Sequence, residues 1–207
     1  MRTTAARLAL AAAGLSVLGM VGGASAATKP NLLSFSDPAG DALATQKAYD
    51  ITKVTVTTKG VTTKKGKVVT YKPKSIVVTM TIAGAFTTTP GANYEVDADV
   101  AGCGYANFTY TPGALSEGGL FTECGSPADS TGSTATLYDM PPTVKGSTVT
   151  WDIPLNALDP SFKQGALLSG ISALATQNDP VFGIVGPGAF VPGGNLDTAS
   201  TDGSVKI

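Results

Sequence analysis

Short runs of alternating apolar and polar residues recur along most of this 207-residue chain, and Gly, Pro, Asn or Asp separates them. Such alternation is typical of β-strands with one buried face, because successive side chains point to opposite sides of a sheet. In residues 75–83 the even-numbered positions are Ile, Val, Met and Ile, which predicts that this face is core. Strands are predicted over residues 49–58, 67–72, 75–83, 93–100, 105–110, 118–123, 134–139 and 147–153.

The pattern becomes less regular after Trp151, which we expect to point inward with Val149 and Ile153. Residues 154–158 predict one short helical turn, and residues 183–194 predict an irregular loop. The periodicity of residues 166–175 allows a buried strand or a short helix, and Gly170 within the segment favours the strand. Closely spaced strands with turns between them favour an all-β fold, a single antiparallel β-sandwich, over a fold of alternating strands and helices.

The N-terminal residues have the pattern of a secretory leader. Arg2 and Arg7 precede an uncharged apolar run over residues 8–21, which ends at Ala24-Ser25-Ala26. A charged start, a short apolar centre and a small-x-small site predict a signal peptide over residues 1–26, and its Ala/Gly-rich composition suggests a bacterial source. We therefore expect a secreted, extracellular domain over residues 27–207, with no membrane span after cleavage.

The residue types that are missing exclude several kinds of chemistry. Both arginines lie in the predicted leader, and the chain contains no His. Without Arg, which supplies the bidentate fork that phosphates and base edges favour, we expect no nucleic-acid recognition. Without His, we expect no Ser-His-Asp or Cys-His catalysis, no His-ligated zinc and no His-ligated haem. Carboxylate, Lys or Tyr chemistry, calcium binding and plain ligand binding remain.

Charge is distributed unevenly along the chain. Residues 27–90 contain nine Lys and three Asp, whereas residues 91–207 contain three Lys and twelve acidic residues. Six of the lysines lie within residues 59–74, in a predicted hairpin that turns at Lys65-Gly66. They would either attract anionic polymers of the cell envelope or keep an exposed strand from pairing with another chain. Strand pairing, which the sequence does not give, decides whether the two signs separate in space.

The only two cysteines, Cys103 and Cys124, both belong to the predicted exported part. An even number of cysteines in an oxidising compartment predicts a disulfide. Closing a loop of about 21 residues would stabilise the fold by roughly 3 kcal/mol on the chain-entropy model.

Three carboxylates, Asp37, Asp41 and Asp50, lie within fourteen residues around a Pro/Gly-containing loop. Calcium binds six to eight hard oxygen ligands of this kind, so these residues are a candidate calcium site. The alternative is a polar turn in which the side chains of Asp37 and Asp41 accept hydrogen bonds from neighbouring amides and Asp50 caps the next strand.

The same loop carries the chain's one family resemblance. Ser36-Asp37-Pro38-Ala39-Gly40-Asp41, followed by Tyr49-Asp50-Ile51-Thr52-Lys53-Val54, resembles the opening of DOMON-like and family 9 carbohydrate-binding-module sandwiches, including the C-terminal domain of glucodextranase-type enzymes. The match covers residues 35–54. It implies a jelly-roll-like sandwich that binds sugars or a cofactor, in some members with a structural calcium. The chain departs from the family in having a single Trp and no His as a haem ligand.

A second acidic group lies on one predicted strand. Glu95, Asp97 and Asp99 alternate with apolar residues, so they share a face and lie about 7 Å apart. Like charges at this spacing raise one another's pKa, which suits a cation site or a general-acid and general-base pair. An ordinary solvent-exposed strand face produces the same alternation.

Aromatic residues gather in and beside the predicted disulfide loop. Tyr105 shares its strand face with Asn107, so this face could stack on a sugar while the amide binds hydroxyl groups. Phe108 and Tyr110 would then point inward. Core packing beneath a disulfide is the alternative explanation for these aromatic residues.

Taken together, these observations favour a secreted, monomeric, non-catalytic binding or envelope-associated module. Its expected ligand is a cell-wall or extracellular polysaccharide, with calcium as a structural ion. Two other classes stay open: an extracellular hydrolase that uses Glu95, Asp97 and Asp99, and an inhibitor-like protein that presents the loop 104–123 to a protease.

Overall fold

The computed structural model describes residues 32–42, 47–87, 91–114, 117–124, 134–158, 165–177 and 195–207. The predicted leader and the predicted loop over residues 183–194 lie outside these ranges. No helix among the described residues is long and apolar enough to cross a membrane.

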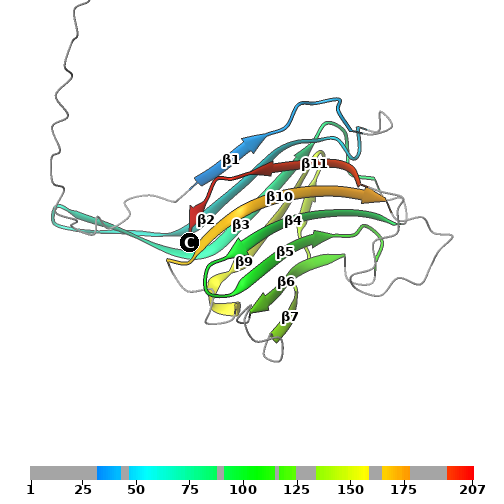
Figure 1. Cartoon of the computed structure of the whole chain (residues 1–207). Coiled ribbons are helices and arrows are strands. Elements are labelled where there is room, and N and C mark those ends of the chain that lie inside the picture. The colour runs from blue at the N-terminus through cyan, green and yellow to red at the C-terminus, as the bar shows by residue number, and fades with distance from the viewer. Residues whose placement is uncertain are drawn as a thin grey trace, which may run out of the picture.

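The described chain forms two antiparallel sheets, which confirms the predicted all-β class (Figure 1). The first, sheet A, has the order β1-β2-β3-β9-β8, and the second, sheet B, has the order β11-β10-β4-β5-β6-β7, with β12 paired to β10. Sheet A consists of β1 (Leu32–Ser36), β2 (Ile51–Lys65), β3 (Val68–Ile82), β8 (Thr143–Lys145) and β9 (Thr148–Pro154). Sheet B consists of β4 (Ala92–Val100), β5 (Gly104–Tyr110), β6 (Gly118–Cys124), β7 (Thr134–Asp139), β10 (Leu167–Gln177), β11 (Asn195–Thr201) and β12 (Val205–Lys206).

The core lies between the two sheets and consists of the predicted inward faces. Ile76, Val78, Met80 and Ile82 of β3 are at most 2% exposed, and the even-numbered residues of β4 are buried as predicted. Trp151 of β9 is fully buried, packs edge-on against Phe108 of β5, and donates a hydrogen bond from Nε1 to the Thr109 carbonyl at 2.7 Å. This side chain therefore connects sheet A to sheet B.

Most predicted elements are confirmed, with differences at their boundaries. Residues 67–72 and 75–83, predicted as two strands, form the single strand β3, which passes through Pro73. Pro73 is tolerated because it pairs with Gly60 where the ladder with β2 shifts register, and such irregularities accept a residue without an N–H. The predicted helical turn is a short 3-10 helix, η2 (Leu155–Ala157).

Four strands have no counterpart in the prediction: β1, β8, β11 and β12. They are short or rich in Ser, Thr, Asn and Asp, so their sequences offer too few alternating apolar residues to predict a strand. Each forms a strand because it pairs with the edge of a better-defined neighbour, as β11 does with β10.

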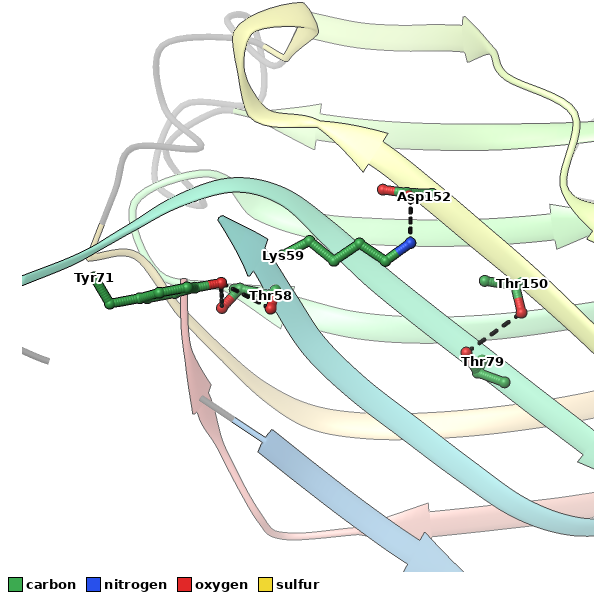
Figure 2. A network of polar contacts seen from close by, with 6 residues as sticks. All are labelled: Thr58, Lys59, Tyr71, Thr79, Thr150 and Asp152. Atoms are coloured by element: carbon green, nitrogen blue, oxygen red, sulfur yellow. Dashed lines mark hydrogen bonds and ion pairs between the residues drawn. The ribbon is translucent and has the colours of Figure 1, made fainter. Parts of the chain in front are cut away.

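Val77 is an odd-numbered residue of β3, on the face opposite the predicted core, but it is only 5% exposed. It does lie on the outer face of sheet A, between Thr57 and Asp152 in the register. Lys59 of β2 forms an ion pair with Asp152 of β9 at 2.6 Å, and these two strands flank β3 (Figure 2). The aliphatic stem of a lysine that spans a strand in this way covers the apolar side chain beneath it.

The β2–β3 hairpin extends well past the rest of sheet A (Figure 1). β1 pairs with β2 only over residues 53–57, and β9 pairs with β3 only over residues 75–81. Residues 60–73 therefore form a two-stranded ribbon, here called the arm, which turns at Gly66 with φ +62 as predicted.

Candidate functional site

The predicted calcium residues lie at one end of the sandwich, where β1 leads into β2. Asp37 directly follows β1, and its backbone N–H donates to the Thr52 carbonyl at 3.1 Å, so the loop folds back onto β2. Gly40 adopts φ +93, a left-handed conformation that glycine accepts readily, and its N–H donates to Oδ2 of Asp50 at 2.7 Å. Asp50 is 3% exposed and thus holds the loop from beneath.

The structure adds a carboxylate that the sequence did not indicate. Asp197 of β11 has one carboxylate oxygen within 4.8 Å of oxygens of Asp37 and Asp41. Asp197 is oriented by two backbone N–H groups, those of Ile51 at 2.5 Å and Thr198 at 2.9 Å. The three closely spaced carboxylates are thus Asp37, Asp41 and Asp197, while Asp50 stands beside them as a support for the loop.

Asp37, Asp41, Asp50 and Asp197 are here called the acidic cluster. Two of its buried oxygens have no hydrogen-bond partner, namely Oδ2 of Asp37 and Oδ1 of Asp50. Burial, followed by the charges of Asp41, Asp197 and Asp50, raises the pKa of Asp37 to about 6. Burial also raises the pKa of Asp197, although its two backbone hydrogen bonds oppose the shift. None of the four carboxylates forms an ion pair with a described residue.

These features fit the requirements of calcium. Oxygens that bind one calcium at 2.3–2.6 Å lie at most about 5 Å apart, and the three carboxylates meet this limit. Buried acceptors without donors are costly unless a cation or a proton satisfies them. Asp37, Asp41 and Asp197 would be the ligands, and a bound ion would remove the repulsion among the four charges.

The predicted binding residues lie on the outer face of sheet B. Asp97 pairs with Asn107 across β4 and β5, and Asp99 pairs with Tyr105. Oδ1 of Asp97 accepts hydrogen bonds from the Tyr105 hydroxyl at 2.6 Å and from Nδ2 of Asn107 at 2.5 Å. The same amide donates to Oε2 of Glu95 at 3.1 Å. Four of the five predicted residues thus form one hydrogen-bonded row, and Asp99 lies at its end, exposed.

Further residues that the sequence analysis did not single out extend this row. Asn93 donates to Glu95 and accepts from the Thr111 hydroxyl. On the other side, Phe121 of β6 pairs with Asn107, and Leu137 of β7, 68% exposed, pairs with Phe121. Phe108 and Tyr110 point into the core, as predicted. The outer face of sheet B therefore combines oriented carboxylates and amides with an apolar strip.

Glu95 and Tyr105 are the titratable groups of this face with shifted pKa values. Burial, then the charge of Asp97, raises the pKa of Glu95, while hydrogen bonds from Asn107 and Asn93 lower it. Burial, then the hydrogen bond and charge of Asp97, raises the pKa of Tyr105, so its hydroxyl stays protonated and donates. The row can therefore present fixed carboxylate acceptors at neutral pH, because the Tyr105 hydroxyl and the buried Asn107 amide already donate within it.

Comparisons of the chain with protein-family models, with curated proteins and with solved structures each gave no match. The resemblance to DOMON-like and family 9 modules therefore stays a prediction.

The segment considered for a protease inhibitor contains two of the predicted strands. Residues 104–110 and 118–124 form β5 and β6, and β6 lies between β5 and β7 within sheet B. Most of the segment is therefore sheet, because β5 pairs with β4 and β6, and β6 pairs with β5 and β7. Its use as an inhibitory loop stays a prediction.

The two cysteines lie at neighbouring positions of this hairpin. Gly104 pairs with Cys124, so Cys103 is one residue from that pair, and it is 1% exposed and not a free thiol. The side chain of Cys124 lies outside the described residues. The predicted disulfide is compatible with this register and stays a prediction.

Proposed function

We propose that this protein is a secreted, non-catalytic binding module that holds a polysaccharide on the outer face of sheet B. The observation that supports this best is the hydrogen-bonded row of Asn93, Glu95, Asp97, Asn107 and Tyr105 beside Phe121. Sugars are bound by such sets of oriented carboxylates and amides, which match hydroxyl groups, next to an apolar surface that covers a ring face.

Calcium has a structural role in this proposal. Asp37, Asp41 and Asp197 come from the start and the end of the described chain, and Asp50 supports the loop between the first two. A cation bound there would fasten β11 of sheet B to the β1–β2 loop of sheet A. The supporting features are the spacing of the three carboxylates and the two buried oxygens without partners.

The proposal includes export and a disulfide. The leader over residues 1–26 would direct the chain to an oxidising compartment, and Cys103 and Cys124 would join the ends of the β5–β6 hairpin there. The jelly-roll-like topology implied by the family resemblance belongs to the same proposal.

The binding test uses the full mature protein on a panel of neutral polysaccharides, namely cellulose, chitin and dextran, with calcium and with EDTA. Tyr105→Phe removes the hydroxyl that donates to Asp97, and Phe121→Ala removes the apolar surface. Tyr71→Phe is the matched control, since its hydroxyl bonds to Thr58 on sheet A. We expect retention on at least one polymer and a loss of about fivefold to tenfold for the first two variants only. No retention on any polymer would refute the proposal.

A hydrolase is the second candidate, because Glu95 has a raised pKa and lies beside Asp97. Two carboxyl groups in different environments are the usual basis of a general-acid and general-base pair. The same binding samples distinguish the two functions: release of reducing ends that Glu95→Gln abolishes would indicate hydrolysis, whereas retention without release supports a binding module.

A further inference from the structure

Charges of opposite sign segregate to the two sheets. Seven lysines lie in β2, β3 and the turn between them, and Lys145 lies in β8, whereas Asp152 is the one acidic residue within the strands of sheet A. Sheet B carries one lysine, Lys206, and six acidic residues in its described strands, namely Glu95, Asp97, Asp99, Glu123, Asp139 and Asp197. Sheet A therefore presents a basic surface, distinct from the row on sheet B.

The outer face of sheet A also carries a row of hydroxyl groups that crosses all five strands. The register places one Ser or Thr per strand in line, namely Ser34, Thr55, Thr79, Thr150 and Thr143. Two pairs are within hydrogen-bond distance: Ser34 Oγ and Thr55 Oγ1 at 3.3 Å, and Thr79 Oγ1 and Thr150 Oγ1 at 3.5 Å (Figure 2). The backbones that carry this row are spaced about 4.8 Å apart.

An open groove of about 440 Å³ lies at one end of the hydroxyl row. Two lysines, three threonines and one aspartate line it: Lys59, Lys145, Thr143, Thr148, Thr150 and Asp152. Asp152 is already paired with Lys59, which lowers the pKa of its carboxyl despite some burial. The groove therefore offers hydroxyl donors together with a net positive charge.

The arm continues this basic face. Alternate residues of β2 share a side, so Lys65 follows Thr55, Thr57 and Lys59 on the outer face, and Lys72 lies opposite Val61 on that same side. No described acidic residue forms an ion pair with Lys65 or Lys72. A two-stranded ribbon is marginally stable in water, and Val61 and Val68 are 51% and 62% exposed, so the arm gains most from a partner that covers it.

We infer that the outer face of sheet A, from the groove along the arm, binds an anionic, hydroxyl-rich polymer. Charge complementarity selects an anion, because Lys145, Lys65 and Lys72 have no acidic partner among the described residues. The hydroxyls of Thr143, Thr148 and Thr150 in the groove favour a sugar-containing polymer over a simple polyanion, because hydroxyl side chains pair with sugar hydroxyls. From Lys59 to Lys65 the face spans about 20 Å, which suits a linear chain and not a single small molecule.

The test is affinity electrophoresis of the mature protein in gels that contain polygalacturonate, wall teichoic acid or polyglutamate. The first two probes separate carboxylate from phosphate as the source of charge, and the third carries charge without sugar. The triple variant Lys65→Gln, Lys72→Gln, Lys145→Gln removes three charges from the proposed face. Lys47→Gln, Lys64→Gln, Lys206→Gln is the matched control. It has the same net charge, Lys64 lies on the opposite side of the arm, and Lys206 lies in β12 of sheet B.

We expect the variant with Lys65, Lys72 and Lys145 replaced to bind the preferred sugar polymer about tenfold more weakly, because it loses three exposed ionic contacts of about 0.5 kcal/mol each. The affinity of the control variant should change by less than about threefold. Thr150→Val, which removes one hydroxyl at constant shape, should weaken binding of the sugar polymer but not of polyglutamate. Equal losses in the two triple variants, equal binding of polyglutamate by the wild type, or no binding of any probe would overturn the inference.

This inference is independent of the proposed function of sheet B. Tyr105→Phe should leave binding of the anionic polymer unchanged, and the lysine variants should leave binding of a neutral polysaccharide unchanged. Failure at one face therefore does not decide the other.

Discussion

The acidic cluster predicts that calcium offsets a fall in the stability of this protein between about pH 4 and pH 6. Without calcium, the pKa of Asp37 in the folded state is about 6, against an ordinary value of 3.8. The folded state therefore binds more protons than the unfolded state between these values, and the free energy of unfolding falls as the pH rises from about 4 to about 6. The raised pKa of Asp197 adds a contribution of the same sign.

The size of the effect follows from the shift. About two pKa units correspond to at most about 3 kcal/mol, and to about 2 kcal/mol once water screens the exposed part of Asp37. Calcium requires the ionised carboxylates, so it binds weakly at pH 4 and tightly at pH 7. At a hundredfold excess over its Kd, calcium adds about 2.7 kcal/mol to the free energy of unfolding, which offsets the stability that is lost by pH 7.

Urea denaturation measures this effect, with the fluorescence of Trp151, the only tryptophan, as the probe, from pH 4 to pH 7.5 in calcium-free buffer and in calcium. Asp37→Asn should raise the stability of the calcium-free protein at pH 7 by about 2 kcal/mol and remove most of the gain from calcium. Asp202→Asn, an exposed acidic residue outside the cluster, is the matched control. Calcium-free stability that is flat or rises between pH 4 and pH 6, or an Asp37→Asn variant that keeps the full calcium response, would refute the reasoning.

Two further predictions concern the core and the cysteines. Trp151→Phe removes the hydrogen bond to the Thr109 carbonyl and leaves space between the sheets. The free energy of unfolding, measured by circular dichroism in urea, should fall by about 2–3 kcal/mol. A fall below about 0.5 kcal/mol would contradict the role given to this residue. Reduction of the predicted Cys103–Cys124 bond should remove roughly 3 kcal/mol and lower Tm by several degrees in differential scanning fluorimetry. An unchanged Tm after mass spectrometry confirms two free thiols would contradict it.

The strands that the sequence predicted correctly are those in which local pattern and burial agree. In β3 and β4 the period of two determines which face is buried, and the structure buries that face. β11 was not predicted, because Asn195, Asp197, Thr198 and Ser200 give no apolar alternation, and its strand conformation depends on pairing with β10. Because β11 was not predicted, Asp197 was not included in the predicted calcium site.

The candidate sites were predictable to the extent that their residues are close in the chain. Asp37, Asp41 and Asp50 share one loop and the start of one strand, and Glu95, Asp97, Tyr105 and Asn107 occupy two consecutive strands. The fourth carboxylate of the acidic cluster comes from 147 residues beyond Asp50, and the hydroxyl row on sheet A comes from strands that are distant in sequence. No local pattern encodes such a juxtaposition.

The sequence by itself therefore determined the all-β class, the inward faces of the main strands and the turn at Gly66, because these depend on side-chain alternation and backbone freedom over a few residues. The tertiary structure decided which carboxylates meet, which hydroxyls align and that positive and negative charges separate onto opposite sheets. These features depend on strand order and register, which are set by packing across the whole sandwich and not by any one segment.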